Sequence, residues 1–317
     1  MDKPMDVLQD FPVRKSKKQK EQFRAAVRSY AESLGYTYQE EPGSFSSRNV
    51  VLGDPEQAEI LITAHYDTCA HQPFPNLITP CNLLLFLLYQ LLLVAVLLAV
   101  VFGVSIGLGI LLQSPMAGIA GYYLLLIALV WFMLCGPANR NNANDNTSGV
   151  VTVLETAASL PPDLRDKVCF VLFDLEEAGL VGSSSYRKHH RKAIGRQWMF
   201  NLDCVGDGDE ILLFPSKSIK KNGAMTDWLR AFGPPAGKKT LTVRDRGFAF
   251  YPSDQAGFPL GVGVAALHRS SWAGLYLGRI HTNRDTVLEE ANVGLLRDYL
   301  LRIIENTHRK DTNYDTL

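Results

Sequence analysis

The chain has 317 residues, enough for one large α/β domain or two modest ones. Lys and Arg total 32 and Asp and Glu total 32, so the formal net charge is zero and nothing global suggests a nucleic-acid partner. The charge is unevenly distributed, because residues 68–139 contain no Asp, Glu, Lys or Arg. All charged side chains therefore lie in the two flanking parts of the chain.

Two further features favour a cytosolic location for the charged parts. The first residues, MDKPMDVLQDFPVRKSKKQK, lack the apolar core of a secretory signal peptide. The cysteines are odd in number and form no Cys-x-x-Cys pair, which favours reduced thiols over a disulfide framework. They are Cys69, Cys81, Cys135, Cys169 and Cys204.

The first predicted elements are a helix and two strands. Residues 15–34 have apolar side chains spaced for one helical face, and Gly35 ends this helix. Residues 49–53 and 59–65 are predicted strands. The second strand is apolar throughout, as expected of a strand buried on both faces of a sheet.

The uncharged segment predicts two long helices, over residues 83–112 and 116–135. A bilayer core of roughly 30 Å needs about 20 helical residues, so each helix is long enough to cross it. The alternative is a pair of buried helices in a soluble protein, but helices this long without a charge are rare in soluble cores. We therefore predict a transmembrane hairpin that contacts the lipid bilayer through residues 83–135.

The rest of the chain alternates helices and strands. Residues 148–160 and 288–307 are predicted helices, and residues 167–175 form a buried strand. Shorter strands are predicted over residues 198–203, 210–215 and 261–267. The alternation predicts an α/β layered sheet. The segment YRKHHRK, with His189 and His190, predicts a solvated basic face.

Five segments place possible metal ligands at predicted strand ends or in loops. They are AHYD (64–67), NANDNTSG (142–149), LFDLEEAGLVGS (172–183), FNLDCVG (200–206) and GRIHTNRDT (278–286). Each alone has an ordinary interpretation, such as a solvated loop or a helix cap. Together they supply two His, two Asp and a Glu-Glu pair, mostly at strand ends, where open α/β sheets place their ligands.

These residue types suit a hydrolytic centre with two metals. Two neighbouring divalent ions need a bridging carboxylate, terminal His and carboxylate ligands, and an open position for water. Adjacent glutamates in an extended segment point to opposite sides, so one can bind metal while the other acts as a base. Asp67 lies two residues after His65, on the same side of an extended strand end, and can accept the other imidazole N–H.

In order and wording, ITAHYDT, NDNTSGV, EEAGLVGS, NLDCVG and HTNRDT resemble the metal motifs of metallopeptidase family twenty-eight. This is the di-zinc aminopeptidase family of clan MH. The resemblance covers about residues 15–307, excluding the apolar segment. It implies a three-layer α/β/α sandwich with a mixed, mostly parallel central sheet, two Zn²⁺ ions per chain and a peptide substrate.

The resemblance also implies a role for each matching residue. His65 and Asp203 would be terminal ligands of one zinc, Glu177 and His281 would bind the other, and Asp145 would bridge both. Glu176 would be the general base, and Asp67 would orient His65. Gln255, in YPSDQAGFPLGVGVAAL, stands where the family often has His, which concerns the substrate rather than the metal site.

A shared metal also constrains the apolar segment. If His65 and Asp145 bind one ion, the chain between them must leave the domain and return, so it crosses a membrane an even number of times. We therefore predict a single catalytic domain of residues 1–77 and 138–317, interrupted by a hairpin of residues 78–137. All 32 Lys and Arg lie on the domain side, so the positive-inside tendency places that domain of an integral membrane protein in the cytosol.

The sequence therefore predicts a membrane-anchored, zinc-dependent aminopeptidase in which Glu176 deprotonates a metal-activated water. One alternative is a glutaminyl-cyclase-like acyl transferase with a single zinc. Another is a non-catalytic membrane scaffold that has a peptidase fold. Zinc stoichiometry, pyroglutamate formation and hydrolysis of aminoacyl anilides distinguish these three.

Overall fold

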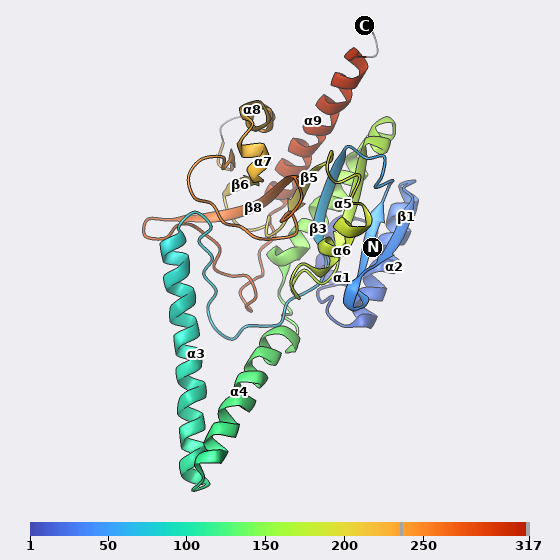
Figure 1. The fold of residues 1–317 in the computed structure, drawn as a ribbon. Helices are drawn as coiled ribbons and strands as arrows, with labels where there is room; N and C mark the ends of the chain where they lie inside the picture. Colours follow the sequence, from blue (N-terminus) through green and yellow to red (C-terminus); the bar gives the residue numbers. More distant parts are fainter. Residues whose placement is uncertain (235–236, 315–317) are drawn as a thin grey trace.

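The computed structural model describes residues 1–234 and 237–314, with side chains described through His308. Its centre is a nine-stranded sheet in the order β1-β2-β4-β3-β5-β8-β6-β7, with β9 paired to β8 (Figure 1). The strands are β1 (Tyr38–Pro42), β2 (Arg48–Leu52), β3 (Ile60–His65), β4 (Val168–Phe173), β5 (Trp198–Leu202), β6 (Glu210–Pro215), β7 (Thr240–Val243), β8 (Leu260–Ser270) and β9 (Gly274–Tyr276).

The four central strands of the sheet, β4, β3, β5 and β8, run parallel. In their register Ile62 of β3 lies opposite Phe170 of β4 on one side and Phe200 of β5 on the other. The strands β2 and β6 flank this group and pair with it in antiparallel fashion. The carboxyl ends of the central strands therefore meet at one edge of the sheet, as in other open α/β sheets.

Helices cover both faces of the sheet. On one face lie α2 (Lys17–Ser33), α5 (Gly149–Ser159), α8 (Gly223–Ala231) and α9 (Glu290–Tyr314), and on the other lies α6 (Val181–His189). Alternate residues of β4 separate these layers, because Phe170 packs with the first group and Val171 packs with α6. This confirms the predicted α/β fold with a central, mostly parallel sheet.

Apart from the two helices of the apolar segment, the other helical segments are short. They are η1 (Pro4–Asp6), α1 (Val7–Asp10), η2 (Ser44–Ser46), η3 (Ala143–Ser148), η4 (Pro162–Lys167) and α7 (Lys217–Lys220).

Helix α2 begins at a reciprocal cap. The hydroxyl of Ser16 accepts the backbone N–H of Gln19, and the Gln19 side chain accepts the backbone N–H of Ser16 at 2.9 Å. A cap of this type stabilises a helix by about 1 kcal/mol. The helix buries Phe23 and Val27 against the sheet, as the sequence pattern predicts.

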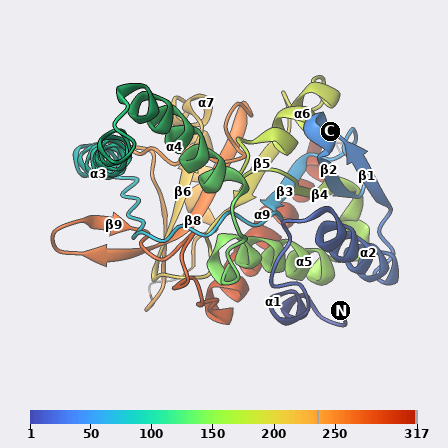
Figure 2. The same ribbon diagram turned by 90° about the horizontal axis from the view of Figure 1, so that it is seen from below.

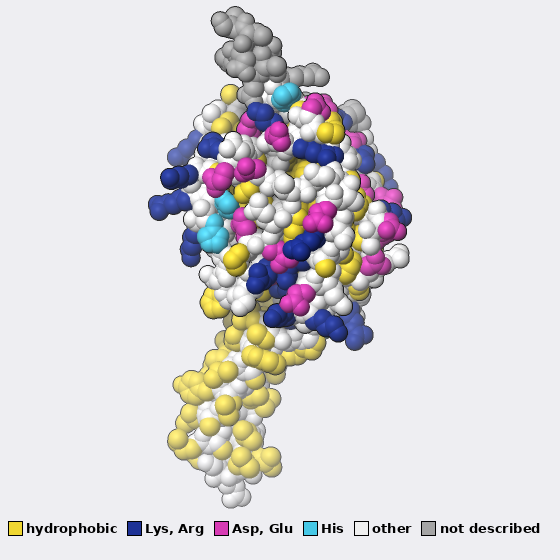
Figure 3. Space-filling view, turned by 90° about the vertical axis from the view of Figure 1, so that its right-hand side faces the viewer, with side chains coloured by type: hydrophobic (Ala, Val, Ile, Leu, Met, Phe, Trp, Pro, Cys, Tyr) yellow, Lys and Arg dark blue, Asp and Glu magenta, His cyan; other side chains and the backbone are white. Residues whose placement is uncertain are grey.

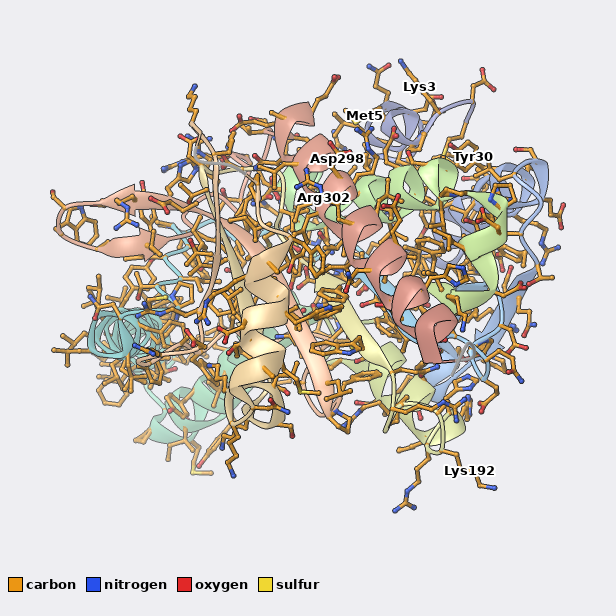
Figure 4. All side chains as sticks on the ribbon, turned by 90° about the horizontal axis from the view of Figure 1, so that it is seen from above. Lys3, Met5, Tyr30, Lys192, Asp298 and Arg302 are labelled. Carbon is orange, nitrogen blue, oxygen red and sulfur yellow. The ribbon has the colours of Figure 1, made fainter. Side chains whose placement is uncertain are left out.

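Helix α9 closes the same face. Leu296, Tyr299 and Ile303 are buried beneath it, and the Tyr299 hydroxyl donates to the backbone carbonyl of Leu229 in α8. Asp298 and Arg302 project from its outer side, where Figure 4 shows the helix lying over the sheet. The amphipathic pattern at the end of the chain therefore predicted this packing correctly.

The apolar segment forms two helices, α3 (Leu83–Leu111) and α4 (Pro115–Cys135), which extend away from the sandwich (Figure 1). Both are capped: the Asn82 side chain accepts the Leu85 N–H, and the Ser114 side chain accepts the Ala117 N–H. Their surface is apolar, whereas charged side chains gather over the sandwich (Figure 3). By length and composition each helix can cross a membrane.

The predicted solvated basic face is confirmed at Lys188, His189, Arg191 and Lys192, which are exposed, but it is wrong at His190. The Nδ1 of His190 lies 2.6 Å from Glu56 Oε1 and its Nε2 lies 2.8 Å from Glu41 Oε1. Glu41 belongs to β1, whose sequence YQEEP is too polar to reveal a strand, so this ion-pair partner was missed.

Candidate metal centre

The seven residues singled out in the sequence lie around the carboxyl end of the sheet. His65 is the last residue of β3, the Glu176–Glu177 pair follows β4, and Asp203 follows β5. Asp145 lies in the irregular turn that precedes α5, and His281 lies in the loop after β9. Parallel strands bring the first three together, and two loops from elsewhere in the chain complete the group.

Asp145 lies between the two histidines. Its Oδ1 is 3.2 Å from His65 Nε2, and its Oδ2 is 2.9 Å from His281 Nε2. On the outer sides, Asp203 Oδ1 is 3.7 Å from His65 Nε2, and Glu177 Oε1 is 3.4 Å from His281 Nε2. Each oxygen of the Asp145 carboxylate therefore faces a different His–carboxylate pair.

Among the residues that the structure describes, three sets of ligand atoms lie close enough to hold a metal ion, with all atoms of a set within 4.8 Å of one another. One set is His65, Asp145 and Asp203; the second is Cys69, Glu177 and His281; the third is His65, Glu176 and Glu177. The first set includes Asp145, and His281 of the second set contacts the other oxygen of the same carboxylate. His, carboxylate and thiolate groups are the donors that Zn²⁺ takes in proteins.

Two buried polar atoms in this group have no hydrogen-bond partner among the described residues. They are His65 Nδ1 and Glu177 Oε1. Buried polar atoms are normally paired, so an unpaired one beside acidic neighbours calls for a bound ion or water. The donor set and the unpaired Glu177 oxygen fit a divalent metal, which would also offset the charge of the crowded carboxylates; His65 Nδ1 instead faces Asp67 Oδ1 at 3.5 Å.

Asp67 holds the turn that carries the two glutamates. Its carboxylate accepts the backbone N–H of Glu176 at 3.0 Å and that of Glu177 at 3.3 Å. Its Oδ1 also lies 3.5 Å from His65 Nδ1. The sequence predicted only the contact with His65, because the glutamates are distant in the chain.

Asp285 supports the turn that carries Asp145. Its two oxygens accept the backbone N–H groups of Asn144 at 2.7 Å and of Asp145 at 3.0 Å. Asp285 thus binds the backbone of a loop that is distant in the chain. The carboxylate between the two histidines is therefore positioned by another buried carboxylate.

The electrostatics of the group follow from burial and crowding. Burial raises the pKa of Glu176 well above its usual range, and its neighbours Glu177 and Asp254 add to this effect. Asp254 is itself fully buried, and burial raises its pKa to about 7. Burial would raise the pKa of Asp145 too, but hydrogen bonds from the two histidines hold it well below its usual range.

The pKa values of both histidines are raised. Burial alone would lower the pKa of His65, but Glu176, Asp145 and other carboxylates raise it well above 6.5. The same balance, with Glu177 as the main carboxylate, raises the pKa of His281. The cluster of carboxylates therefore draws positive charge to its centre.

A cavity of about 180 Å³ opens over these groups. Its acidic and imidazole lining comprises His65, Asp145, Glu176, Glu177, Asp203 and His281, and its remaining lining comprises Ile78, Phe86, Cys204, Phe250, Tyr251, Pro252 and Ile280. A larger hollow of about 730 Å³ lies between α3 and α4 near their turn, but no His, Asp or Glu lines it. Of these two cavities, only the smaller is lined by His, Asp and Glu side chains, which can bind a metal or transfer a proton.

Two residues need comment beside the seven. Gln255 does not line this cavity; its amide donates to the Tyr251 carbonyl and accepts from Asn201. The sequence did not identify Cys69 as a site residue, although its sulfur lies within 4.8 Å of ligand atoms of Glu177 and His281. The available signal was its spacing, because it lies two residues beyond Asp67 in an extended segment and so shares the same side.

Comparisons with known proteins identify the family and the fold. A family model described as Peptidase family M28 matches residues 132–302. Aminopeptidase YwaD of Bacillus subtilis (strain 168) is 46% identical over 67 residues, a segment that covers 20% of this chain and 15% of that protein.

Solved structures with low sequence identity share the fold. A glutaminyl cyclase from Porphyromonas gingivalis superposes with a TM-score of 0.60 at 15% identity, covering 96% of each chain. A Zn-dependent exopeptidase from Parabacteroides distasonis ATCC 8503 gives 0.57 at 14% identity, covering 93% of this chain and 92% of that one. The LapA aminopeptidase of Legionella pneumophila gives 0.57 at 13% identity, covering 95% and 67%.

Proposed function

Because this chain belongs to peptidase family M28, we propose that it is a membrane-anchored, zinc-dependent aminopeptidase. The observation that carries the proposal is the position of Asp145, whose two carboxylate oxygens face two separate His–carboxylate pairs. This is the arrangement that two adjacent metal ions with a shared carboxylate require.

The proposed ligands follow from the distances. His65 and Asp203 would hold one zinc, Glu177 and His281 the other, and Asp145 both. Bound zinc would polarise the scissile carbonyl and make water a nucleophile near neutral pH. Both roles need metal ligands with little freedom; His65, Asp145 and Asp203 are buried, and Glu177 and His281 are half-buried.

Glu176 is the proposed general base. It lines the cavity, and its backbone is held by Asp67, which keeps it beside its metal-binding neighbour Glu177. The Glu176 carboxylate would take a proton from the attacking water and pass it to the leaving amine.

We propose that residues 78–137 form an inserted hairpin that crosses the bilayer through residues 83–135, with residues 1–77 and 138–317 as one domain. The apolar surface of α3 and α4 supports this. At the base of the hairpin, the Lys15 ammonium donates to the Leu134 carbonyl at 3.1 Å. The basic segment around Lys15 thus lies at the domain end of α4, which favours the cytosolic side for the domain.

An exposed aromatic residue also lies near the base of the hairpin. Trp272, in the turn between β8 and β9, is 68% exposed. Figures 1 and 2 both place this ribbon beside the start of α3. Trp is common at the level of lipid head groups, so this turn supports a position of the domain next to the membrane surface.

Elemental analysis of the purified full-length protein, combined with a panel of aminoacyl anilides, tests the proposal. We expect two zinc ions per chain and hydrolysis that a chelator abolishes. One zinc per chain with pyroglutamate formed from an N-terminal glutamine would instead indicate a cyclase. Bound metal without hydrolysis of any anilide or peptide would favour a non-catalytic scaffold.

A further inference from the structure

One residue of the apolar hairpin lines the cavity over the carboxylates. Phe86 lies in the first turn of α3 and is half-buried. Its ring packs against that of Phe250, with the ring centroids 6.3 Å apart and the planes at 60°. Phe250 lines the same cavity from the loop before β8. The hairpin therefore contributes directly to the wall of the proposed active site.

The start of α3 is fixed to the loops of the site. Ile78 and Leu277 exchange two backbone hydrogen bonds of 2.9 Å each, and Leu277 lies four residues before His281. The backbone N–H of Phe250 donates to the carbonyl of Pro80 at 2.9 Å. These bonds hold the first turn of α3, and Phe86 with it, at a set distance from the carboxylates.

The cavity has two chemically different sides. Ile78, Phe86, Phe250 and Ile280 form an apolar wall, and Ile280 directly precedes His281. Among the described residues that line the cavity, none is Lys or Arg. An acidic side chain would therefore find no cation against this wall, whereas an apolar side chain would gain from leaving water.

We propose that Phe86 is a specificity-determining residue and that the site takes peptides with a large apolar N-terminal residue. This inference rests on the proposed aminopeptidase function. The side chain of the first residue packs against Phe86 and Phe250, while its amino group and scissile carbonyl lie over the carboxylates. Through Phe86, the hairpin thus helps to select the N-terminal residue of the substrate, in addition to any role as a membrane anchor.

The test uses the full-length protein in detergent and aminoacyl anilides of Leu, Phe, Ala and Glu. The variants are Phe86→Ala, Phe86→Leu and Leu87→Ala. Leu87 is the matched control, because it is the next residue of the same helix turn, is 46% exposed and does not line the cavity. The measured quantity is the ratio of kcat/KM for Leu or Phe to kcat/KM for Ala.

The wild type should favour Leu and Phe over Ala by roughly tenfold or more, since a single methylene in an apolar pocket changes kcat/KM by about 10–200-fold. Phe86→Ala should lower that ratio by about tenfold while kcat/KM for Ala changes little. Phe86→Leu should restore most of the ratio, and Leu87→Ala should leave it unchanged.

An unchanged ratio in Phe86→Ala, or a wild type that prefers Glu or treats all four anilides alike, would overturn the inference while leaving the aminopeptidase proposal intact. An equal loss in Leu87→Ala would also overturn it, because the effect would then belong to the helix and not to the wall. A metal-loaded wild type without activity on any anilide would instead contradict the proposed function itself.

Discussion

The Asp67 carboxylate accepts the backbone N–H of Glu176 at 3.0 Å, although the two residues are 109 positions apart in the chain. This bond ties the end of β3 to the turn that follows β4. It places the proposed base relative to His65 without using the Glu176 side chain. The position of that base is thus set by a residue on a different strand.

Replacing Asp67 with Asn should therefore impair the site while the fold persists. The Asn side chain can accept one of the two backbone N–H groups but presents its own N–H₂ to the other. We expect a loss of about 10–100-fold in metal affinity or in kcat/KM, the usual cost of removing a partner of a metal ligand. Competition titration with a zinc chelator measures the first quantity and anilide hydrolysis the second. Unchanged values for both would show that Asp67 has no positioning role.

Replacing Glu176 with Gln should abolish hydrolysis and leave metal binding in place. Gln has nearly the same shape but cannot accept the proton, so kcat should fall by about 10²–10⁴-fold. Glu32→Gln on the exposed side of α2 is the matched control and should keep wild-type kcat. Zinc content by elemental analysis should equal that of the wild type. Retained activity in Glu176→Gln would exclude this residue as the base.

Replacing Asp285 with Asn should lower stability. Both oxygens of Asp285 accept buried backbone N–H groups, and Asn leaves one of those groups facing another donor. An unsatisfied buried group costs about 1–3 kcal/mol. Asp298→Asn, at an exposed position on α9, should cost less than about 0.5 kcal/mol. Thermal unfolding of the metal-free protein compares the two, and equal Tm values would contradict the assigned role of Asp285.

His190 should make stability depend on pH. Burial alone would lower the pKa of His190, but its hydrogen bonds to Glu41 and Glu56 outweigh burial and raise the pKa above 6.5. A raised histidine pKa adds stability that is fully present below pH 6.5 and is lost as pH rises through the folded-state value. The Tm difference between wild type and His190→Gln should therefore shrink as pH rises. His189→Gln, at an exposed position, should show no such trend. A difference that grows with pH would refute this account.

Replacing residues 78–137 with a short polar loop should give a protein that stays in solution and keeps its metal. The ligands proposed here all lie outside this segment, so zinc content should match that of the full chain. The full-length protein should float with lipid vesicles and resist alkaline extraction, and the shortened protein should do neither. Loss of zinc from the shortened protein would show that the hairpin is part of the structural frame of the site.

The sequence predicted much of the fold because the central strands are continuous apolar runs. β3, β4 and β5 were all anticipated, and the motifs at their ends were correctly expected to converge, since parallel strands end at one edge. Local patterns also defined α2, α5 and α9. The roles assigned to the converging side chains remain predictions.

Other parts could not be predicted, because they depend on pairs that are distant in the chain. The support of Asp145 by Asp285 joins two loops 140 positions apart. His190 in a basic run gave no sign of Glu41 and Glu56, and the polar strand β1 that carries Glu41 has no apolar periodicity. Phe86 looked like any other apolar residue of a membrane helix until its contact with Phe250 was known.

The place of the hairpin in the chain also bears on how the protein is synthesised. β3 is one of the two inner strands of the parallel group, and it precedes α3 in the sequence. Both of its sheet neighbours, β4 and β5, follow α4. The ribosome therefore releases the whole apolar hairpin while β3 still lacks both partners. Under the proposed membrane insertion, the hairpin would therefore be available to the bilayer before the sheet can close around β3.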